Sequence, residues 1–225
     1  RLQDLSIDQA QRSSDQLQAI EIARGAESSI AVAFRRDALS EDRTDHYGEP
    51  WAQAGQEALE IEGGLIEVNV ADAQAAFNIN RLVDGRLTDM AMFGKVARAA
   101  GLSSASELAV VQALASTGPI GDVRDLQNFG LGSEECEQLA QFSTALPGPA
   151  PINANTANEQ VLNAVIGNPG VIARIMALRE REGHLTREAL SQAGVLLPTG
   201  VGLETSHLYV EILVTHGDAR LKRRS

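Results

Sequence analysis

The residues best suited to grip a ligand lie in 151-PINANTANEQVLNAV-165, where polar side chains come directly before a helix with periodic apolar residues. Asn153 and Asn155 carry short amides that can hydrogen-bond a turn. Thr156 and Glu159 have the spacing of a capping box, with Thr156 as the N-cap and Glu159 at the third helical position. The stretch could bind something, or it could only build the start of the helix. The capping box alone accounts for Thr156.

A second candidate is the loop predicted over residues 40–57, which contains Asp42, Asp45 and His46. These side chains could belong to a metal site or to an enzyme. Ligands of metal sites usually come with tighter spacing and supporting structure. We therefore predict a solvated loop with the single tryptophan, Trp51, packed back on the fold.

His207, His216 and the single cysteine, Cys136, are the remaining reactive side chains that we considered. No nucleophile–base spacing or phosphate-binding loop accompanies the two histidines, so we expect them at the surface near strand ends. Cys136 has no His or Asn pattern around it and is predicted to be a partly buried small residue. These residues therefore give no support to the alternative that the protein is an enzyme.

Charge and composition narrow the function classes. The chain has 225 residues, a net charge of -11 and only 4% aromatic residues. An acidic chain repels nucleic acid and anionic membranes, although a local basic patch is still allowed. We expect the basic runs Arg35-Arg36 and Lys222-Arg223-Arg224 to be solvated. No secretory signal or run of about 18 apolar residues occurs.

The elements that must position these residues begin with one long helix, predicted over residues 1 to about 39. Apolar residues recur there at spacings of three and four, which is typical of one buried helical face. This stripe consists of Leu17, Ile20, Ala23, Ala26, Ile30 and Phe34. The first half of the helix is polar nearly all round and is expected to project.

Strand patterns occur in two separate places. Residues 58–70 alternate apolar and polar side chains around Gly63-Gly64, which predicts a β-hairpin with one wet face. Residues 207–216 alternate again, Gly217-Asp218 reads as a turn, and a further strand begins near Arg220.

Between the two sets of strands, strand signals vanish and Gly and Pro punctuate short helical patterns. Helices are predicted at 87–100, 103–115, 122–129, 133–145, 157–166, 169–182 and 186–193. The simplest topology is an α+β fold, a long helix plus an antiparallel sheet, with a large all-α domain inserted into the sheet region. We place the first part of the α+β domain at 1–84, the inserted domain at 85–206 and the last strands at 207–225.

The segment 161–190 resembles a helix-hairpin-helix, with the tight turn at Asn168-Pro169-Gly170. Such hairpins can offer backbone N–H groups to a phosphate, but Pro169 has none. Positive and negative side chains also nearly cancel here, whereas a phosphate-tracking surface carries a positive excess. We interpret the motif as a scaffold and keep nucleic-acid binding as the alternative function.

Several motifs, in order along nearly the whole chain, resemble the type II secretion minor pseudopilin K family. They are Arg12-Ser13-Ser14, Ala33-Phe34-Arg35-Arg36-Asp37, Asp45-His46-Tyr47-Gly48-Glu49-Pro50-Trp51-Ala52, Asp72 before Phe77-Asn78-Ile79-Asn80, and Pro151-Ile152-Asn153-Ala154-Asn155-Thr156-Ala157. Each motif alone would be weak, and the combination is specific.

The resemblance implies a pilin-like fold and a non-enzymatic protein at the tip of the pseudopilus, in complex with minor pseudopilins I and J, and with H as a further candidate. It implies a periplasmic domain whose N-terminal apolar helix, absent here, anchors it in the inner membrane. The inserted domain would be too bulky for the body of a filament. The apolar stripe, including Leu17, Ile20, Ala23, Ile30 and Phe34, would pack partly on the protein's own sheet and partly on partner helices.

The chain departs from the family in the first half of the inserted domain. Members carry an acidic stretch there, whereas here Leu114-Ala115-Ser116-Thr117-Gly118-Pro119 passes directly to the next helix. Calcium has been associated with this domain in the family, and Ca²⁺ requires six to eight oxygen ligands. We therefore expect no cofactor, and calcium stays as the open alternative.

Overall fold

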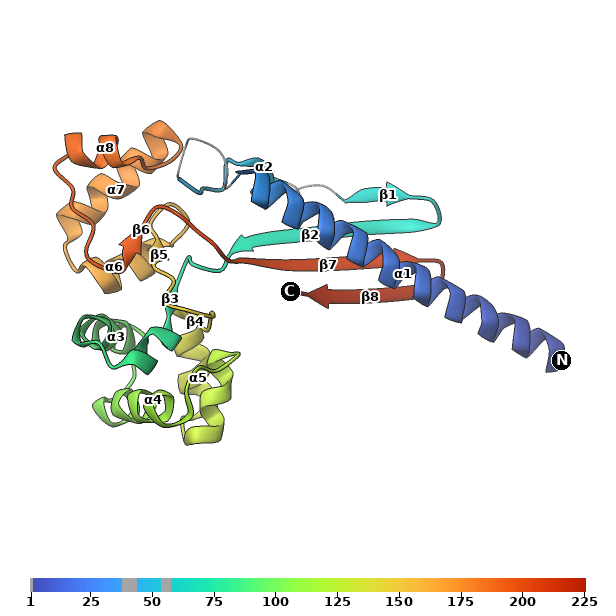
Figure 1. The fold of residues 1–225 in the computed structure, drawn as a ribbon, viewed down its shortest axis with the longest axis horizontal. Coiled ribbons are helices and arrows are strands. Elements are labelled where there is room, and N and C mark those ends of the chain that lie inside the picture. Colours follow the sequence, from blue (N-terminus) through green and yellow to red (C-terminus); the bar gives the residue numbers. More distant parts are fainter. Residues whose placement is uncertain (1, 38–43, 54–57) are drawn as a thin grey trace. The chain divides into compact units, whose positions relative to one another are not determined.

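The computed structural model describes residues 2–37, 44–53 and 58–225, with the side chains of the first helix described over residues 9–36 (Figure 1). The chain divides into two compact units. Unit 1 combines the N-terminal helix, residues 47–71 and residues 208–225, and unit 2 comprises residues 44–46 and 72–207.

Unit 1 is built from a long helix and a four-stranded sheet. The helices are α1 (Leu2–Asp37) and the short α2 (Pro50–Gln53), and the strands are β1 (Leu59–Ile61), β2 (Gly64–Asp72), β7 (Leu208–His216) and β8 (Ala219–Arg224). The sheet order is β1-β2-β7-β8, and the arrows of neighbouring strands run in opposite directions in Figure 1. The predicted pilin-like α+β fold, a long helix with an antiparallel sheet, is confirmed.

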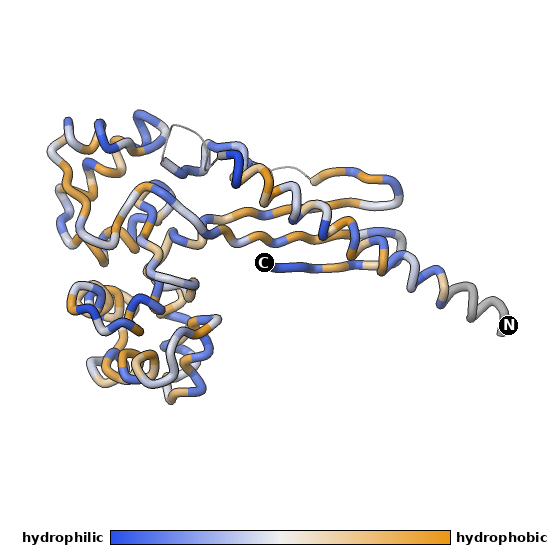
Figure 2. Tube along the Cα trace, viewed as in Figure 1, coloured by the Kyte–Doolittle hydropathy of each residue, from blue (hydrophilic) through white to orange (hydrophobic). Residues whose placement is uncertain are grey.

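The sheet has the alternation that the sequence indicated. Val210, Ile212 and Val214 of β7 are buried and alternate with more exposed neighbours, and hydrophobic and polar residues alternate along β2 in Figure 2. Helix α1 packs on β7 and β8 and contributes Ala19, Ala23 and Ile30 to the same core. The apolar face of α1 thus covers the apolar face of the sheet, and unit 1 consists of one helical layer and one sheet layer.

The β1–β2 turn depends on glycine. Gly63 has a φ of 80°, and a Cβ on Gly64 would stand 1.8 Å from the carbonyl oxygen of Thr215 in the neighbouring strand. Gly64 therefore lets β2 start close against β7, while Gly63 supplies the left-handed backbone that the turn requires.

Unit 2 is mainly helical. Its helices are η1 (Ile79–Asp84), α3 (Leu87–Ala99), α4 (Ser104–Thr117), η2 (Val123–Phe129), α5 (Ser133–Ala140), α6 (Glu159–Ile166), α7 (Pro169–Glu182) and α8 (Arg187–Gln192), where η denotes 3₁₀ geometry. They enclose one apolar core in which Phe77, Phe93, Leu114 and Leu162 are fully buried.

Two features of unit 2 differ from the prediction. Short parallel strand pairs lie within it, β3 (Phe77–Asn78) with β4 (Ser143–Thr144) and β5 (Ile152–Asn153) with β6 (Val201–Gly202). Two residues per strand are too few to give an alternating pattern, so these strands could not be predicted from the sequence. The helix predicted at 133–145 ends at Ala140, because the chain then joins β3 through β4.

The boundary of the inserted segment also differs. We predicted its start at residue 85, but the compact unit begins at Asp72. Phe77, Ile79 and Leu82 belong to the apolar core of unit 2, so the segment 72–84 folds with the helices that follow it. Within the described residues, no helix combines the length and the apolar character needed to cross a membrane.

Candidate functional site

Asp72 is the centre of a buried polar cluster in unit 2. Its Oδ1 accepts hydrogen bonds from the backbone N–H of Gln74 at 2.7 Å and from Thr205 Oγ1 at 2.7 Å. Its Oδ2 accepts from Asn153 Nδ2 at 2.8 Å and from Thr156 Oγ1 at 2.6 Å. Four donors compensate the carboxylate, which is 4% exposed, for its lost water. A carboxylate engaged in this way holds its surroundings together and is poorly placed to take a proton from a substrate.

Asn153 extends this cluster to the segment that contains Asp45. Its Nδ2 also donates to the backbone carbonyl of Asp45 at 2.9 Å, and its Oδ1 accepts from the N–H of Asn155 at 2.9 Å. Asp45 in turn accepts from the N–H of Thr205 through Oδ2 at 2.6 Å. Hydrogen bonds thus join four positions that are far apart in sequence, namely residues 45, 72, 153 and 205.

Asn155 clamps a different piece of backbone. Its Oδ1 accepts from the N–H of Leu185 at 2.6 Å, and its Nδ2 donates to the carbonyl of the same residue at 3.2 Å. One amide side chain thereby satisfies both polar groups of a buried peptide segment. Asn153 and Asn155 therefore bind the protein's own chain rather than a ligand.

The predicted capping box is wrong. Helix α6 begins at Glu159, and its N-cap is Asn158, whose Oδ1 accepts from the N–H of Val161 at 2.8 Å. Thr156 lies in the preceding turn and donates its hydroxyl to Asp72. Glu159 stands at the first helical position and not at the third, so it cannot complete a capping box. The buried carboxylate competes successfully for the hydroxyl of Thr156.

The asparagines of the motif Phe77-Asn78-Ile79-Asn80 also hydrogen-bond backbone groups of distant segments, as Asn153 and Asn155 do. Asn78 accepts from the N–H of Leu146 at 3.0 Å and donates to the carbonyl of Gly148 at 2.8 Å. Asn80 accepts from the N–H of Ile120 at 2.9 Å and donates to its carbonyl at 2.9 Å. Phe77 is fully buried between these clamps.

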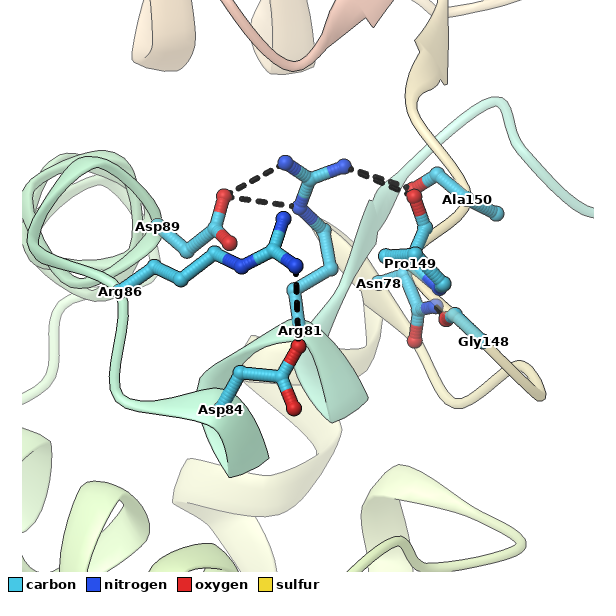
Figure 3. A network of polar contacts seen from close by, with 8 residues as sticks. All are labelled: Asn78, Arg81, Asp84, Arg86, Asp89, Gly148, Pro149 and Ala150. Atoms are coloured by element: carbon cyan, nitrogen blue, oxygen red, sulfur yellow. Dashed lines mark hydrogen bonds and ion pairs between the residues drawn. The ribbon is translucent and has the colours of Figure 1, made fainter.

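A buried ion pair that sequence reasoning missed lies beside this motif (Figure 3). Arg81 Nε and Nη2 donate to Asp89 Oδ1 at 3.0 and 2.5 Å, and Arg81 Nη1 donates to the carbonyls of Pro149 and Ala150 at 3.1 and 3.3 Å. The available signal was an arginine close to Ile79, Leu82 and Val83, which needs a partner if it is buried with them. The pair joins η1, the first turn of α3 and the segment before β5.

The surroundings of the histidines are given by the described residues. His46 stacks on His184 with ring centroids 4.1 Å apart, and His207 Nδ1 lies 2.9 Å from Ser206 Oγ. His207 and His216 are half-buried, so the expectation of surface histidines was only partly right. Asp42, the third member of the proposed acid–histidine cluster, lies outside the described residues.

Cys136 and Trp51 are both fully buried. Burial, followed by the charges of Glu135 and Glu137, raises the pKa of the Cys136 thiol, which keeps it protonated and unreactive near neutral pH. Across the described part of the chain, no group of three or more His, Cys, Asp or Glu side chains is placed to hold a metal ion.

The backbone N–H groups of the hairpin before α7 are already hydrogen-bonded to an asparagine of the same hairpin. Asn168 Oδ1 accepts from the N–H groups of Gly170 at 3.0 Å and Val171 at 3.2 Å. These are the backbone donors that a phosphate would need. Together with Pro169 at the first helical position, this cap makes the hairpin a helix start.

The stripe predicted on the long helix separates into two faces. Ala23 and Ile30 are buried in the core of unit 1, and Phe34 packs edge-on against Trp51 with ring centroids 6.2 Å apart. Leu17 is 64% exposed, and Ile20 is only half-buried. Spacings of three and four occur on neighbouring faces of a helix alike. The sequence pattern therefore could not tell which residues of the stripe face the sheet and which face outward.

The basic runs are exposed but not all of them are simply solvated. Arg223 pairs with Glu27 of α1 at 2.7 Å, and Glu211 pairs with Lys222 at 2.8 Å and with Arg224 at 2.6 Å. Hydrogen bonds from Lys222 and then Arg224 hold the pKa of Glu211 below its usual range.

Comparisons with known proteins agree with the motif resemblance. The chain is 26% identical over 250 residues to type II secretion system protein K of Pseudomonas aeruginosa, covering 90% of this chain and 74% of that protein. It is 25% identical over 255 residues to the protein of the same name from Pectobacterium carotovorum subsp. carotovorum, covering 90% and 77%. A 68-residue stretch, 30% of this chain and 21% of the relative, is 40% identical to the Klebsiella pneumoniae protein of that name. No family model matches the chain.

The fold has a solved counterpart. A chain in the crystal structure of the GspK-GspI-GspJ complex from the enterotoxigenic Escherichia coli type 2 secretion system matches with a TM-score of 0.73 and 16% identity. The match covers 96% of this chain and 92% of that one. The resemblance to the type II secretion protein K family is therefore confirmed, and the solved chain supports the fold.

Proposed function

We propose that this chain is the periplasmic part of a non-enzymatic minor pseudopilin. In this role it caps the tip of the type II secretion pseudopilus and nucleates its assembly with minor pseudopilins I and J. The proposal extends what is known of its relatives, which are named as components of this secretion system. An anchor in the inner membrane is part of the same proposal.

The observation that carries the assembly role is the outer face of α1. Leu17 and Val32 are 64% and 46% exposed, although the opposite face of the same helix is buried against the protein's own sheet. Leu17 and Ile20 are three positions apart on α1, so their apolar side chains adjoin on this face. We take this contiguous apolar patch as the surface that another protein covers. Leu17 and Ile20 are the residues of the predicted partner stripe that this proposal retains.

The tip position is supported by the size of the inserted unit. Residues 72–207 of the 225-residue chain, more than half, fold into a unit with its own apolar core. A subunit in the body of a helical filament must fit between neighbours above and below, whereas the end subunit has one free side. We infer that the bulk of unit 2 is tolerated best at the end.

The partners follow from the solved counterpart, which is part of a complex with GspI and GspJ. The test is size-exclusion chromatography with light scattering of this chain, alone and mixed with the soluble domains of the I-type and J-type proteins. A stable 1:1:1 complex is the expected result. A chain that stays monomeric in the mixture would contradict the assembly role.

We also propose that the chain works without a resident cofactor, calcium included. The carboxylates of Asp72 and Asp89 in unit 2 already take their donors from protein groups. The thermal midpoint should therefore be the same in a chelator and in millimolar calcium. A midpoint that rises with calcium would show a site that this proposal lacks.

Nucleic-acid binding finds no support. The backbone donors of the hairpin are engaged by Asn168, and the chain carries a net charge of -11. A binding titration with duplex DNA across salt concentrations should give no saturable, salt-dependent signal.

A further inference from the structure

Strand β8 has a charge opposite to that of the whole chain. Four of the six residues from Ala219 to Arg224 are basic, namely Arg220, Lys222, Arg223 and Arg224, in a chain of net charge -11. β8 is also the last strand in the sheet order β1-β2-β7-β8. A concentrated positive charge therefore lies along one edge of the sheet.

The backbone of β8 has an inner and an outer set of polar groups. Ser225 exchanges both backbone hydrogen bonds with Val210, at 2.8 and 2.9 Å, and the register pairs Ile212 with Arg223 and Val214 with Leu221. In an antiparallel ladder, every second residue turns its N–H and C=O toward the partner strand. Residues 221, 223 and 225 thus face β7, and residues 220, 222 and 224 face outward.

No strand continues the sheet beyond β8 among the residues that the structure describes. The outward N–H and C=O groups of Arg220, Lys222 and Arg224 form a regular row to which an extended chain could add. Such strand addition takes its affinity from main-chain hydrogen bonds and its specificity from the side chains.

The charges decide which chain fits. Arg223 is paired with Glu27 of α1, and Glu211 is shared between Lys222 and Arg224. Four cations therefore face two carboxylates, and the described residues give Arg220 no ion pair. Cross-strand side chains on one face lie about 4.5–5.5 Å apart, where opposite charges attract and like charges repel. A second copy of β8 would bring cations against cations, and basic edges protect proteins against such self-pairing.

We propose that the outer edge of β8 receives an extended acidic segment of an assembly partner as an added strand. The proposal rests on the assembly role described above, because that role supplies the partner. It places a second contact on unit 1, built from backbone and charge, in addition to the apolar face of α1.

The direct test uses a fluorescein-labelled peptide of alternating glutamate and valine and its lysine–valine counterpart. Wild-type chain should bind the acidic peptide, more weakly as salt is raised, and should not bind the basic one. Absence of binding to the acidic peptide at low salt would overturn the proposal.

Two variants at one position separate backbone pairing from charge. Lys222→Pro removes an outward N–H and leaves the bonds to β7, because position 222 faces the open edge. Lys222→Gln removes the same charge and keeps the N–H. We expect Lys222→Pro to bind the acidic peptide at least tenfold more weakly than Lys222→Gln. Equal affinities would mean that the peptide is held by charge alone, without strand addition.

Arg220→Glu gives a variant with an intact backbone in case Lys222→Pro does not fold. Its side chain is exposed and its backbone groups point away from β7, so the fold should survive. Binding of the acidic peptide should fall at least tenfold. Unchanged binding would overturn the proposal.

Amide exchange in the complex separates failure of this inference from failure of the assembly role. In the free chain, the amides of Arg220, Lys222 and Arg224 should exchange faster than those of Leu221 and Arg223. Addition of the I-type and J-type domains should slow the first three at least tenfold. A complex that forms without this change would overturn strand addition and leave the assembly role intact. Peptide binding without any complex with the I-type and J-type domains would support strand addition and contradict the assembly role.

Discussion

At the residue scale, the polar side chains that looked most like a ligand site turn out to bind other groups of the protein itself. Asp72, Asn153 and Asn155 each satisfy donors or acceptors from segments distant in sequence. Buried polar groups in such clusters cost free energy whenever one partner is removed. Their function is to fix the path of the chain where no regular ladder can do so.

The revised role of Thr156 makes a prediction. Thr156→Val removes one of four donors to the buried Asp72 carboxylate and should destabilise the protein by about 1–3 kcal/mol. Asn158→Ala, the matched loss of the actual N-cap of α6, should cost about 1 kcal/mol. Thermal unfolding of both variants checks this. If Thr156→Val left the midpoint unchanged while Asn158→Ala lowered it, the carboxylate cluster would be unimportant for stability.

Sequence reasoning could find these residues but could not find their partners. The asparagine motifs stood out because short amides cluster beside apolar runs. Their acceptors, such as the carbonyl of Gly148 and the backbone of Leu185, are peptide groups that no residue type marks. For the same reason Thr156 was assigned to the local capping box, since its bond to Asp72 spans 84 positions.

At the scale of elements, the sheet of unit 1 was predictable because period-two alternation is a strong signal over nine residues. The Gly63-Gly64 turn was predictable as well, and the structure adds the reason for Gly64. The two-residue strands of unit 2 were not predictable, because they arise from pairing across the fold rather than from a local pattern.

The close approach at Gly64 predicts a strong effect of one methyl group. Gly64→Ala would place its Cβ 1.8 Å from the Thr215 carbonyl oxygen and should cost at least about 1–3 kcal/mol. Gly25→Ala is the control, because nothing lies within 4 Å of its added Cβ and α1 should gain roughly 0.5–1 kcal/mol. Chemical denaturation of the two variants should give shifts of opposite sign, and equal shifts would contradict the described register.

The β7–β8 hairpin makes a prediction about pH. Lys222 and Arg224 hydrogen-bond Glu211 and keep its pKa below 4.5, the ordinary value for a glutamate. Because the folded pKa is lowered, this stabilisation is present above about pH 4.5 and is lost as the pH falls through the folded value. A carboxyl titration by NMR should place Glu211 below 4.5, and Arg224→Gln should move it upward. A pKa of 4.5 or above in the wild type would show that the pairs do not form in solution.

At the scale of the molecule, the chain consists of two compact units with different roles in the proposal. Unit 1 carries the helix and sheet on which the assembly surfaces lie. Unit 2 supplies bulk and is fixed internally by buried polar clusters. The overall division into a pilin-like fold and an inserted segment followed from the order of strand and helix patterns, whereas the boundary at Asp72 required knowledge of which core Phe77 joins.

The two faces of α1 separate assembly from folding. Ile30→Glu buries a charge in the core of unit 1 and should lower the thermal midpoint of the isolated chain. Leu17→Glu changes a side chain that is 64% exposed and should leave that midpoint unchanged. The effect of each variant on unfolding therefore has to be known before its effect on assembly is interpreted.

The most direct test of the assembly role is calorimetry of the chain, as wild type and as Leu17→Glu, with the I-type and J-type soluble domains. We expect a complex with the wild type and an affinity at least tenfold weaker, about 1.4 kcal/mol, for the folded variant. Equal affinities would contradict the assignment of the outer face of α1 as the assembly surface.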